Sequence, residues 1–173
     1  MKNISPVLPV AQRGEDILKL IAAPVAESEF SSVWLFELAQ AMQATMQERN
    51  GVGIAAPQVY ISKRIIIVAS RPNPRYPDAP EMQAICMINP EIIEQSEAYE
   101  LGEEGCLSVP NERGQVARAH QITVQYFSLN GEKIIQEFTG FPARIVQHEI
   151  DHLNGILFVD HVEKTQKASV ISD

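Results

Sequence analysis

The sequence predicts an α+β fold, with mostly antiparallel sheets packed around a central metal-binding helix that carries an H-E-x-x-H pattern. Three observations predict this class. Helical patterns lie on both sides of a long middle segment, this segment holds several strand patterns, and Asn130-Gly131 within it is a strong hairpin signal. The 173 residues are about the size of one domain, so we expect a single domain over residues 1–173.

Two helices are expected before the strands. Residues 14–21 place acidic side chains ahead of apolar positions, and Pro24 follows them, which predicts a short helix. From Ser32 to about Arg49, apolar residues recur at steps of three and four, the spacing of a helix with one buried face. Asn50-Gly51 supplies the left-handed residues that end such a helix.

The middle of the chain has the composition of short strands separated by turns. Strands are expected at residues 65–68, 85–88, 91–94, 98–101, 122–129 and 133–138, with one more at 156–159. Residues 71–80 contain four prolines and predict an irregular surface connection, to which the sequence assigns no role. The last helix is expected over residues 141–154, because Pro142 lies near its start and Gly155 just beyond its end.

Composition limits the possible partners. The chain has 14 Lys and Arg against 22 Asp and Glu, a formal net charge of -8, which disfavours direct binding to nucleic acid or to an anionic membrane. No signal peptide, transit peptide or stretch of membrane-spanning length is evident. Two cysteines, Cys86 and Cys106, are too few for a disulfide framework. We therefore expect a soluble protein of the cytoplasm.

The pattern His148-Glu149-Ile150-Asp151-His152 lies inside the last expected helix. Residues four apart share one helical face, so both imidazoles can bind the same metal ion, with Glu149 beside them as the acid and base that acts on water. The alternative is a pair of histidines that are satisfied in the core or exposed on a surface helix. The spacing favours a metal-dependent hydrolase.

A catalytic site of this kind usually needs a third protein ligand. An extended protease pattern would place a further histidine at position 158, but Phe158 stands there. The search therefore turns upstream to Cys106, because a thiolate is a strong ligand for zinc or ferrous iron. The alternative, a small buried hydrophobic residue, stays open for Cys106 and is the preferred interpretation of Cys86.

The segment GVGIAAPQ, residues 51–58, lacks the glycine spacing and the preceding strand of a nucleotide-binding loop. Its small residues allow a backbone or a substrate to approach closely. Gln58 carries an amide donor that could stabilise an oxyanion. A tight connection between a helix and a strand explains the segment equally well.

Taken in order, GVGIAAPQ, EGCLS and QHEIDHLNG resemble the three signature motifs of the peptide deformylases, and the resemblance extends from Val25 to Val162. The resemblance implies that Cys106, His148 and His152 hold one divalent ion, usually ferrous iron, although zinc, nickel or cobalt can occupy the site. It implies that Glu149 transfers the protons while the formyl group of N-formylmethionine is removed from a nascent peptide and formate is released.

The resemblance also implies the substrate contacts. The Gln58 side chain and the Leu107 backbone N–H would stabilise the oxyanion. Further binding residues would be the backbone of Val52, Gly53 and Gly105, the pocket side chains Phe141 and Ile145, and the nearby Arg118. Core packing is the alternative for Ile145. Asp151 could support the site or lie on a solvated helix face, and Arg144 is expected at the surface.

Several alternatives remain at the level of sequence. The H-E-x-x-H pattern alone also fits a metalloprotease or another amidase, and Cys106 with a histidine could form a metal-free hydrolase. A binding module without activity would need neither Glu149 nor Gln58, so the presence of both argues against this alternative. Only eleven residues follow Val162, without the long basic helix that some deformylases use to dock on the ribosome, so ribosome contact is expected to be at most transient.

Overall fold

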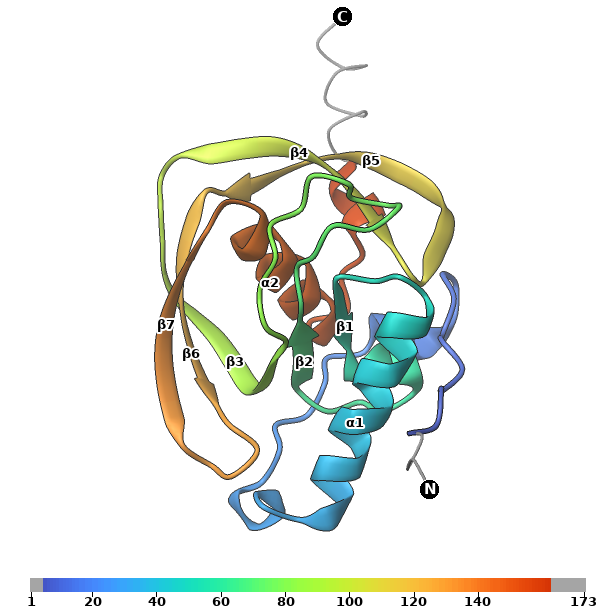
Figure 1. Cartoon of the computed structure of the whole chain (residues 1–173), viewed down its shortest axis with the longest axis vertical. Helices are drawn as coiled ribbons and strands as arrows, with labels where there is room; N and C mark the ends of the chain where they lie inside the picture. The colour runs from blue at the N-terminus through green and yellow to red at the C-terminus, as the bar shows by residue number, and fades with distance from the viewer. Residues whose placement is uncertain (1–4, 163–173) are drawn as a thin grey trace, which may run out of the picture.

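The computed structural model describes residues 5–162. It has two antiparallel sheets, and helix α2 (Gly140–Leu153) contacts strands of both (Figure 1). The larger sheet has the order β1-β2-β3-β6-β7, and the smaller one pairs β4 with β5. The strands are β1 (Gly53–Ala55), β2 (Ile65–Val68), β3 (Ile85–Gln95), β4 (Tyr99–Cys106), β5 (Val109–Ala119), β6 (Gln121–Phe127) and β7 (Lys133–Thr139). This confirms the α+β class with antiparallel sheets.

Alternating hydrophobicity explains the half-buried strands of the larger sheet. Along β6, Ile122, Val124 and Tyr126 are buried while the residues between them are partly exposed, which is the period of two that a strand requires. The expected hairpin joins β6 to β7. Its turn closes through a hydrogen bond from Gly131 N–H to the Ser128 carbonyl, and Gly131 has a φ of 87°, which glycine adopts without steric cost.

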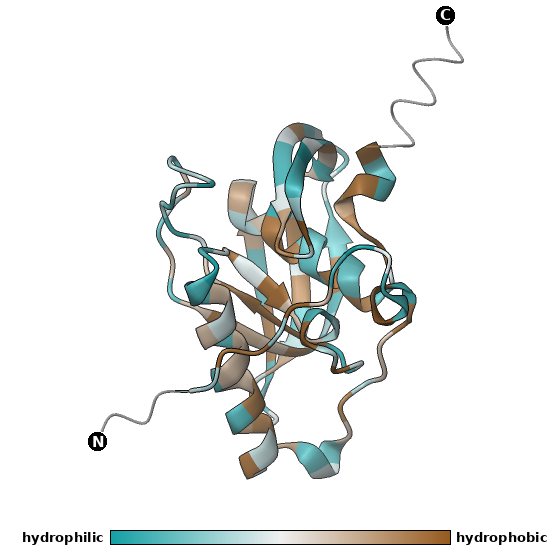
Figure 2. Cartoon of the chain, turned by 90° about the vertical axis from the view of Figure 1, so that its right-hand side faces the viewer, coloured by the Kyte–Doolittle hydropathy of each residue, from teal (hydrophilic) through white to brown (hydrophobic). Residues whose placement is uncertain are grey.

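Helix α1 (Val33–Glu48) covers one side of the larger sheet. It begins where the Ser32 side chain accepts a hydrogen bond from Leu35 N–H, and the chain leaves it through Asn50, which has a φ of 56°. Its apolar face, including Leu35 and Met42, packs against β1 and β2. Figure 2 shows brown and teal residues alternating along the helices, as expected for elements with one buried face.

Helix α2 packs on the other side of the same sheet. Ala143, Val146 and Leu153 form a core with side chains of β2, β3 and β6. The helix is followed by Gly155, with a φ of 74°, close to the carbonyl of Lys19, so the expected end at this glycine is confirmed. Because apolar contacts hold α2 along most of its length, its polar side chains are held in defined positions.

Several boundaries differ from the expected ones. The strands expected at 85–88 and 91–94 form one strand, β3, whose register shifts near Asn89. The strand expected at 98–101 continues to Cys106, and β5 was not expected at all. Residues 14–21 contain only the short 3-10 helix η1 (Asp16–Lys19); two more are η2 (Glu27–Glu29) and η3 (Ala56–Val59).

The prediction of a strand at residues 156–159 is wrong. Residues 158–162 are helical, and Phe158 packs into a core cluster with Cys106 and Val116 rather than into a sheet. Within residues 5–162, no helix is long and apolar enough to cross a membrane. The expectation of at most transient ribosome contact rests on residues 163–173, which lie outside the described residues.

Candidate metal centre

Helix α2 brings two histidines and a glutamate to one place. His148 and His152 lie one turn apart, with their ring centroids separated by 5.1 Å, and Glu149 lies beside them. All three side chains are buried, and His152 is only 1% exposed. Buried imidazoles and carboxylates need partners in the interior, so this face of α2 is suited to a polar site.

Cys106 reaches the same place from the end of β4, where the chain turns into β5. Its Sγ lies 3.3 Å from Nε2 of His152, and the Ser108 N–H donates to it at 3.4 Å. The ligand atoms of Cys106, His148 and His152 all lie within 4.8 Å of one another. The structure therefore brings together the three residues that the sequence suggested as metal ligands.

The donor set fits a divalent cation. One thiolate and two imidazoles are ligands that zinc and ferrous iron accept. One buried polar atom that faces the cluster, Oε1 of Glu149, has no hydrogen-bond partner among residues 5–162. Unpartnered buried polar atoms are rare in proteins, so this cluster is suited to a ligand of its own.

The electrostatics of the cluster favour a cation as well. Burial would raise the pKa of Cys106, but the imidazoles of His152 and His148 hold it well below its usual range. Burial would lower the pKa of His148, but the negative charge of Glu149 and the hydrogen bonds that the ring donates to Cys106 and Glu104 keep it well above its usual range. Burial raises the pKa of Glu149 to about 7. The negative charge that retains protons here would also attract a metal ion.

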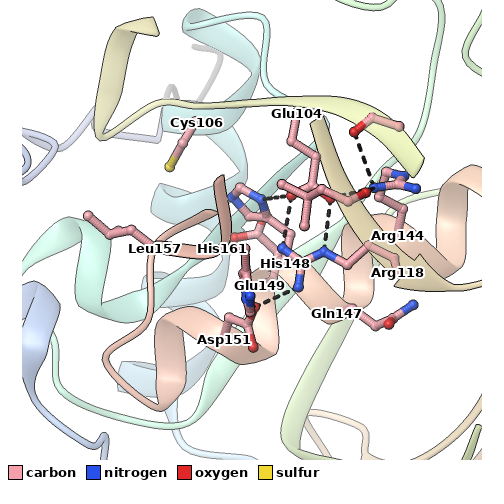
Figure 3. A network of polar contacts seen from close by, with 12 residues as sticks. Glu104, Cys106, Arg118, Arg144, Gln147, His148, Glu149, Asp151, Leu157 and His161 are labelled. Carbon is pink, nitrogen blue, oxygen red and sulfur yellow. Dashed lines mark hydrogen bonds and ion pairs between the residues drawn. The ribbon is translucent and has the colours of Figure 1, made fainter. Parts of the chain in front are cut away.

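Glu104 on β4 is the centre of a buried network (Figure 3). Its Oε1 lies 3.0 Å from Nδ1 of His148, Arg118 donates to both of its oxygens at 2.9 Å, and Arg144 donates to Oε2 at 2.7 Å. Burial would raise the pKa of Glu104, but the hydrogen bonds from Arg118 and His148 hold it well below its usual range. A carboxylate on Nδ1 orients the ring so that Nε2 faces the cluster. Glu104 is thus a supporting residue that was not predicted.

The network corrects the expectation for Arg144. This side chain is buried, not at the surface, and it donates to the carbonyls of Val116 and Glu100 at 2.7 Å as well as to Glu104. It lies under the ribbon of β4 and β5. Because the sequence did not predict β5, it also did not predict that this strand would cover α2.

Arg118 also lies elsewhere than expected. It does not line the cavity at the cluster, and it is held between Glu104 and Asp151, whose Oδ2 accepts from it at 2.6 Å. Asp151 also contacts Nε2 of His161 at 2.9 Å. Arg118 therefore connects β5 to α2, where Asp151 is its partner.

A cavity opens beside the cluster. It is lined by the expected residues Val52, Gly53, Gln58, Gly105, Cys106, Leu107, Phe141, Ile145, His148 and Glu149. Arg75 and Tyr76, from the proline-rich connection of residues 71–80, also line it. No local motif in the sequence indicated that this connection would reach the site, because the contact depends on tertiary packing.

Gln58, at the end of the glycine-rich segment, is held with its amide toward Cys106. Its Oε1 accepts from Ala55 N–H at 2.9 Å, while its Nε2 donates to Ser108 Oγ at 3.1 Å and to Cys106 Sγ at 3.5 Å. Gln58 is 1% exposed. A buried amide held from both ends is a preorganised donor of the kind that stabilises an oxyanion.

Gly53 lies so close to α2 that only a residue without a side chain fits. A Cβ here would be 2.5 Å from Oε2 of Glu149 and 2.8 Å from Ile145. We therefore expect Gly53→Ala to displace the carboxylate and to lower kcat about 10²-fold, as a misplacement of about 1 Å can. Gly51→Ala, where the nearest atom would be a flexible Leu107 methyl at 3.0 Å, is the control and should lose much less.

Steady-state kinetics and thermal unfolding of the two glycine variants test this expectation. Equal losses of kcat in Gly53→Ala and Gly51→Ala, or a loss explained by unfolding, would contradict it.

An α+β fold with a buried Cys-His-His cluster and a carboxylate on an open cavity defines the class of metal-dependent hydrolases. A family model described as polypeptide deformylase matches residues 7–168. The chain therefore belongs to the polypeptide deformylase family. Its activity is the removal of the formyl group from the N-terminal formylmethionine of newly made polypeptides.

Relatives agree with this assignment over almost the whole chain. Peptide deformylase 2 of Nostoc sp. is 49% identical over 157 residues, which cover 91% of this chain and 87% of the relative. Peptide deformylase 2 of Shewanella oneidensis is 47% identical over 160 residues, 92% of this chain and 87% of the relative. A solved class I type b peptide deformylase from Acinetobacter baumannii is 72% identical, with a TM-score of 0.90 over 91% of this chain and 99% of that chain.

Proposed function

We propose that Cys106, His148 and His152 hold one divalent ion at which the formyl group is hydrolysed. The observation that carries this proposal is the convergence of their ligand atoms within 4.8 Å, beside the buried Glu149. We propose ferrous iron as the native ion, with zinc, nickel or cobalt as alternatives that the same ligands accept. A divalent ion supplies Lewis acidity, which polarises a carbonyl and lowers the pKa of water.

Glu149 is proposed as the group that moves the protons. It borders the cavity, and its Oε1 has no hydrogen-bond partner among the residues described, so the carboxylate can accept the proton of a water that attacks the formyl carbon. The same oxygen can then donate this proton to the amine nitrogen as the bond to the formyl carbon breaks. One carboxylate would thus serve both steps, and formate and a free N-terminus result.

The developing oxyanion is proposed to bind two N–H donors. The Gln58 amide is held in place by Ala55, and the Leu107 backbone N–H follows Cys106 at the turn after β4. Removing one such donor typically costs about 3 to 4 kcal/mol of transition-state stabilisation.

The peptide is proposed to bind as an added strand. β1 is an edge strand of the larger sheet, so backbone groups of Val52 and Gly53 that do not pair with β2 can pair with a substrate. The Gly105 N–H already donates to Tyr76 Oη at 2.9 Å, so the peptide is proposed to pair with the Gly105 carbonyl. Phe141 and Ile145 would form the wall of a methionine pocket. The Acinetobacter baumannii relative was crystallised with Met-Ala-Ser bound, which supports binding of a peptide that begins with methionine.

The test is formate release from a formyl-Met tripeptide by anaerobically purified protein loaded with iron or nickel. We expect rapid release that stops after chelation and returns with added metal. Cleavage of internal peptide bonds without preference for formyl would indicate a protease, and full activity after metal removal would indicate a cysteine hydrolase. No turnover of the loaded protein would contradict the proposal.

Metal removal should also change the reactivity of one cysteine. Cys106 borders the cavity, so iodoacetamide should modify it only after chelation has removed its metal. Burial raises the pKa of Cys86 to about 12, so at pH 8 this thiol is protonated and should stay unmodified. Mass spectrometry should show one adduct after chelation, none in loaded protein and none in chelated Cys106→Ala. Equal labelling with and without metal would exclude Cys106 as a ligand.

We further propose that the chain acts as a single catalytic domain in the cytoplasm. Its net charge of -8 supports substrate binding without direct contact to nucleic acid. Any contact with the ribosome is proposed to be transient.

A further inference from the structure

The connection between β2 and β3, which includes residues 71–80, forms an ordered part of the cavity wall. Within it, the Asn73 side chain accepts from the N–H groups of Arg75 and Tyr76 at 2.9 and 3.1 Å, and Ser70 Oγ donates to the Pro80 carbonyl at 2.6 Å. These bonds hold the irregular backbone in one conformation. In Figure 1 it runs from β2 toward the ribbon of β4 and β5 before it returns to β3.

Three contacts anchor this connection to the site. Tyr76 Oη accepts from Gly105 N–H at 2.9 Å, and the Tyr76 ring lies 4.9 Å from the ring of Phe141. The guanidinium of Arg113 on β5 lies 4.7 Å above the Tyr76 ring and donates to the Arg75 carbonyl at 3.1 Å. Arg75 is therefore placed beside the strand residue that precedes Cys106.

Two guanidinium groups converge where Gly105 has no side chain. A Cβ on Gly105 would lie 2.8 Å from Nη2 of Arg75 and 3.4 Å from Nη1 of Arg113. One carboxylate serves the pair, because Glu103 contacts Arg113 at 3.0 Å. The Arg75 side chain is half-buried and has no hydrogen bond or ion pair within residues 5–162.

The other acidic groups nearby have partners of their own. Glu104 is held by Arg118, Arg144 and His148, and Glu112 contacts Arg13 at 2.8 Å. Among the residues described, Arg75 is thus the one cation at this cavity wall that has no carboxylate partner. A half-buried guanidinium without a partner favours an anionic ligand, and a carboxylate matches its planar donors in a bidentate manner.

We propose that Arg75 is a specificity-determining residue that binds a carboxylate of the substrate on the downstream side of its methionine. The proposal rests on the proposed binding mode, in which the peptide passes Gly105. A carboxylate there can come from an aspartate or glutamate at the second or third residue of a nascent chain, or from the C-terminus of a short peptide. Arg75 contributes to binding and does not touch the reacting carbon.

The experiment compares kcat/KM for matched peptides with the metal-loaded enzyme. The pairs are formyl-Met-Glu-Ala amide against formyl-Met-Gln-Ala amide, formyl-Met-Ala-Glu amide against formyl-Met-Ala-Gln amide, and formyl-Met-Ala-Ala acid against its amide. We expect a preference of roughly five- to tenfold for the carboxylate in at least one pair, expressed in KM and weakened by salt. The responding pair identifies the source of the carboxylate.

Arg75→Gln should bring the favoured ratio close to one. Arg71→Gln removes the same charge from the same connection, away from the cavity lining, and should keep both the ratio and the activity of the parent. Ratios near one in the parent enzyme for all three pairs, a ratio that survives in Arg75→Gln, or an equal loss in Arg71→Gln would each overturn the proposal. Because the readout is a ratio of rates, it is distinguishable from failure of the proposed function, in which the parent releases no formate from any peptide.

Discussion

Glu149→Gln is expected to lower kcat for deformylation by about 10² to 10⁴-fold while the protein keeps its metal. The amide has nearly the shape of the carboxylate but cannot take a proton from water. Because Cys106, His148 and His152 remain, the proposed ligand set is intact. Burial around the side chain also excludes bulk water as an efficient substitute, since Glu149 is 4% exposed.

Formate release at saturating substrate measures the loss of kcat. The metal content per protein chain shows whether the metal is retained. Glu137→Gln is the matched control, because it makes the same exchange at an exposed position of β7 and should leave kcat unchanged. Turnover of Glu149→Gln near that of the parent would exclude Glu149 as the proton carrier. Loss of metal together with activity would assign it to the ligand set instead.

Local spacing was enough to predict one half of the site. His148, Glu149 and His152 were predicted because the period of a helix places residues three and four apart on one face, and α2 forms over nearly the expected range. Cys106 was suggested by chemistry and strengthened by the resemblance of three motifs. Its nearness to His152, 3.3 Å between Sγ and Nε2, could not follow from spacing, because 46 residues separate the two.

The supporting half of the site depends on tertiary packing that leaves no local pattern. β5 contains Pro110 and Gly114 and several charged residues, so its sequence does not have the alternation of a half-buried strand. It forms because the turn after Cys106 lets it pair with β4 along nearly its whole length. Once that ribbon is in place over α2, Arg144 is buried, and the connection from β2 to β3 reaches the cavity.

Glu104→Ala is expected to have the largest effect on stability. Removing one partner from a buried ionic network leaves charges without compensation, which typically lowers the free energy of unfolding by about 3 to 5 kcal/mol. Here the loss would leave both Arg118, 5% exposed, and Arg144, 8% exposed, without their shared carboxylate. Asp151 would still contact Arg118, but Arg144 would retain only backbone carbonyls.

The same substitution should weaken metal binding, because Nδ1 of His148 loses the carboxylate 3.0 Å away that orients its ring. Loss of such a partner typically costs about 10- to 100-fold in metal affinity. Glu104→Gln keeps the shape and should lose less stability, so it allows metal affinity to be measured if the alanine variant does not fold.

Urea unfolding of the metal-free protein separates the two effects of Glu104→Ala, and competition with a chelator measures the affinity. Glu103→Ala is the neighbouring control, since its carboxylate is 54% exposed and its ion pair with Arg113 should contribute at most about 1 kcal/mol. Equal destabilisation by the two alanine substitutions would mean that the buried network contributes no more than a surface pair. Unchanged metal affinity in Glu104→Gln would mean that the negative charge of this side chain is not needed to orient His148.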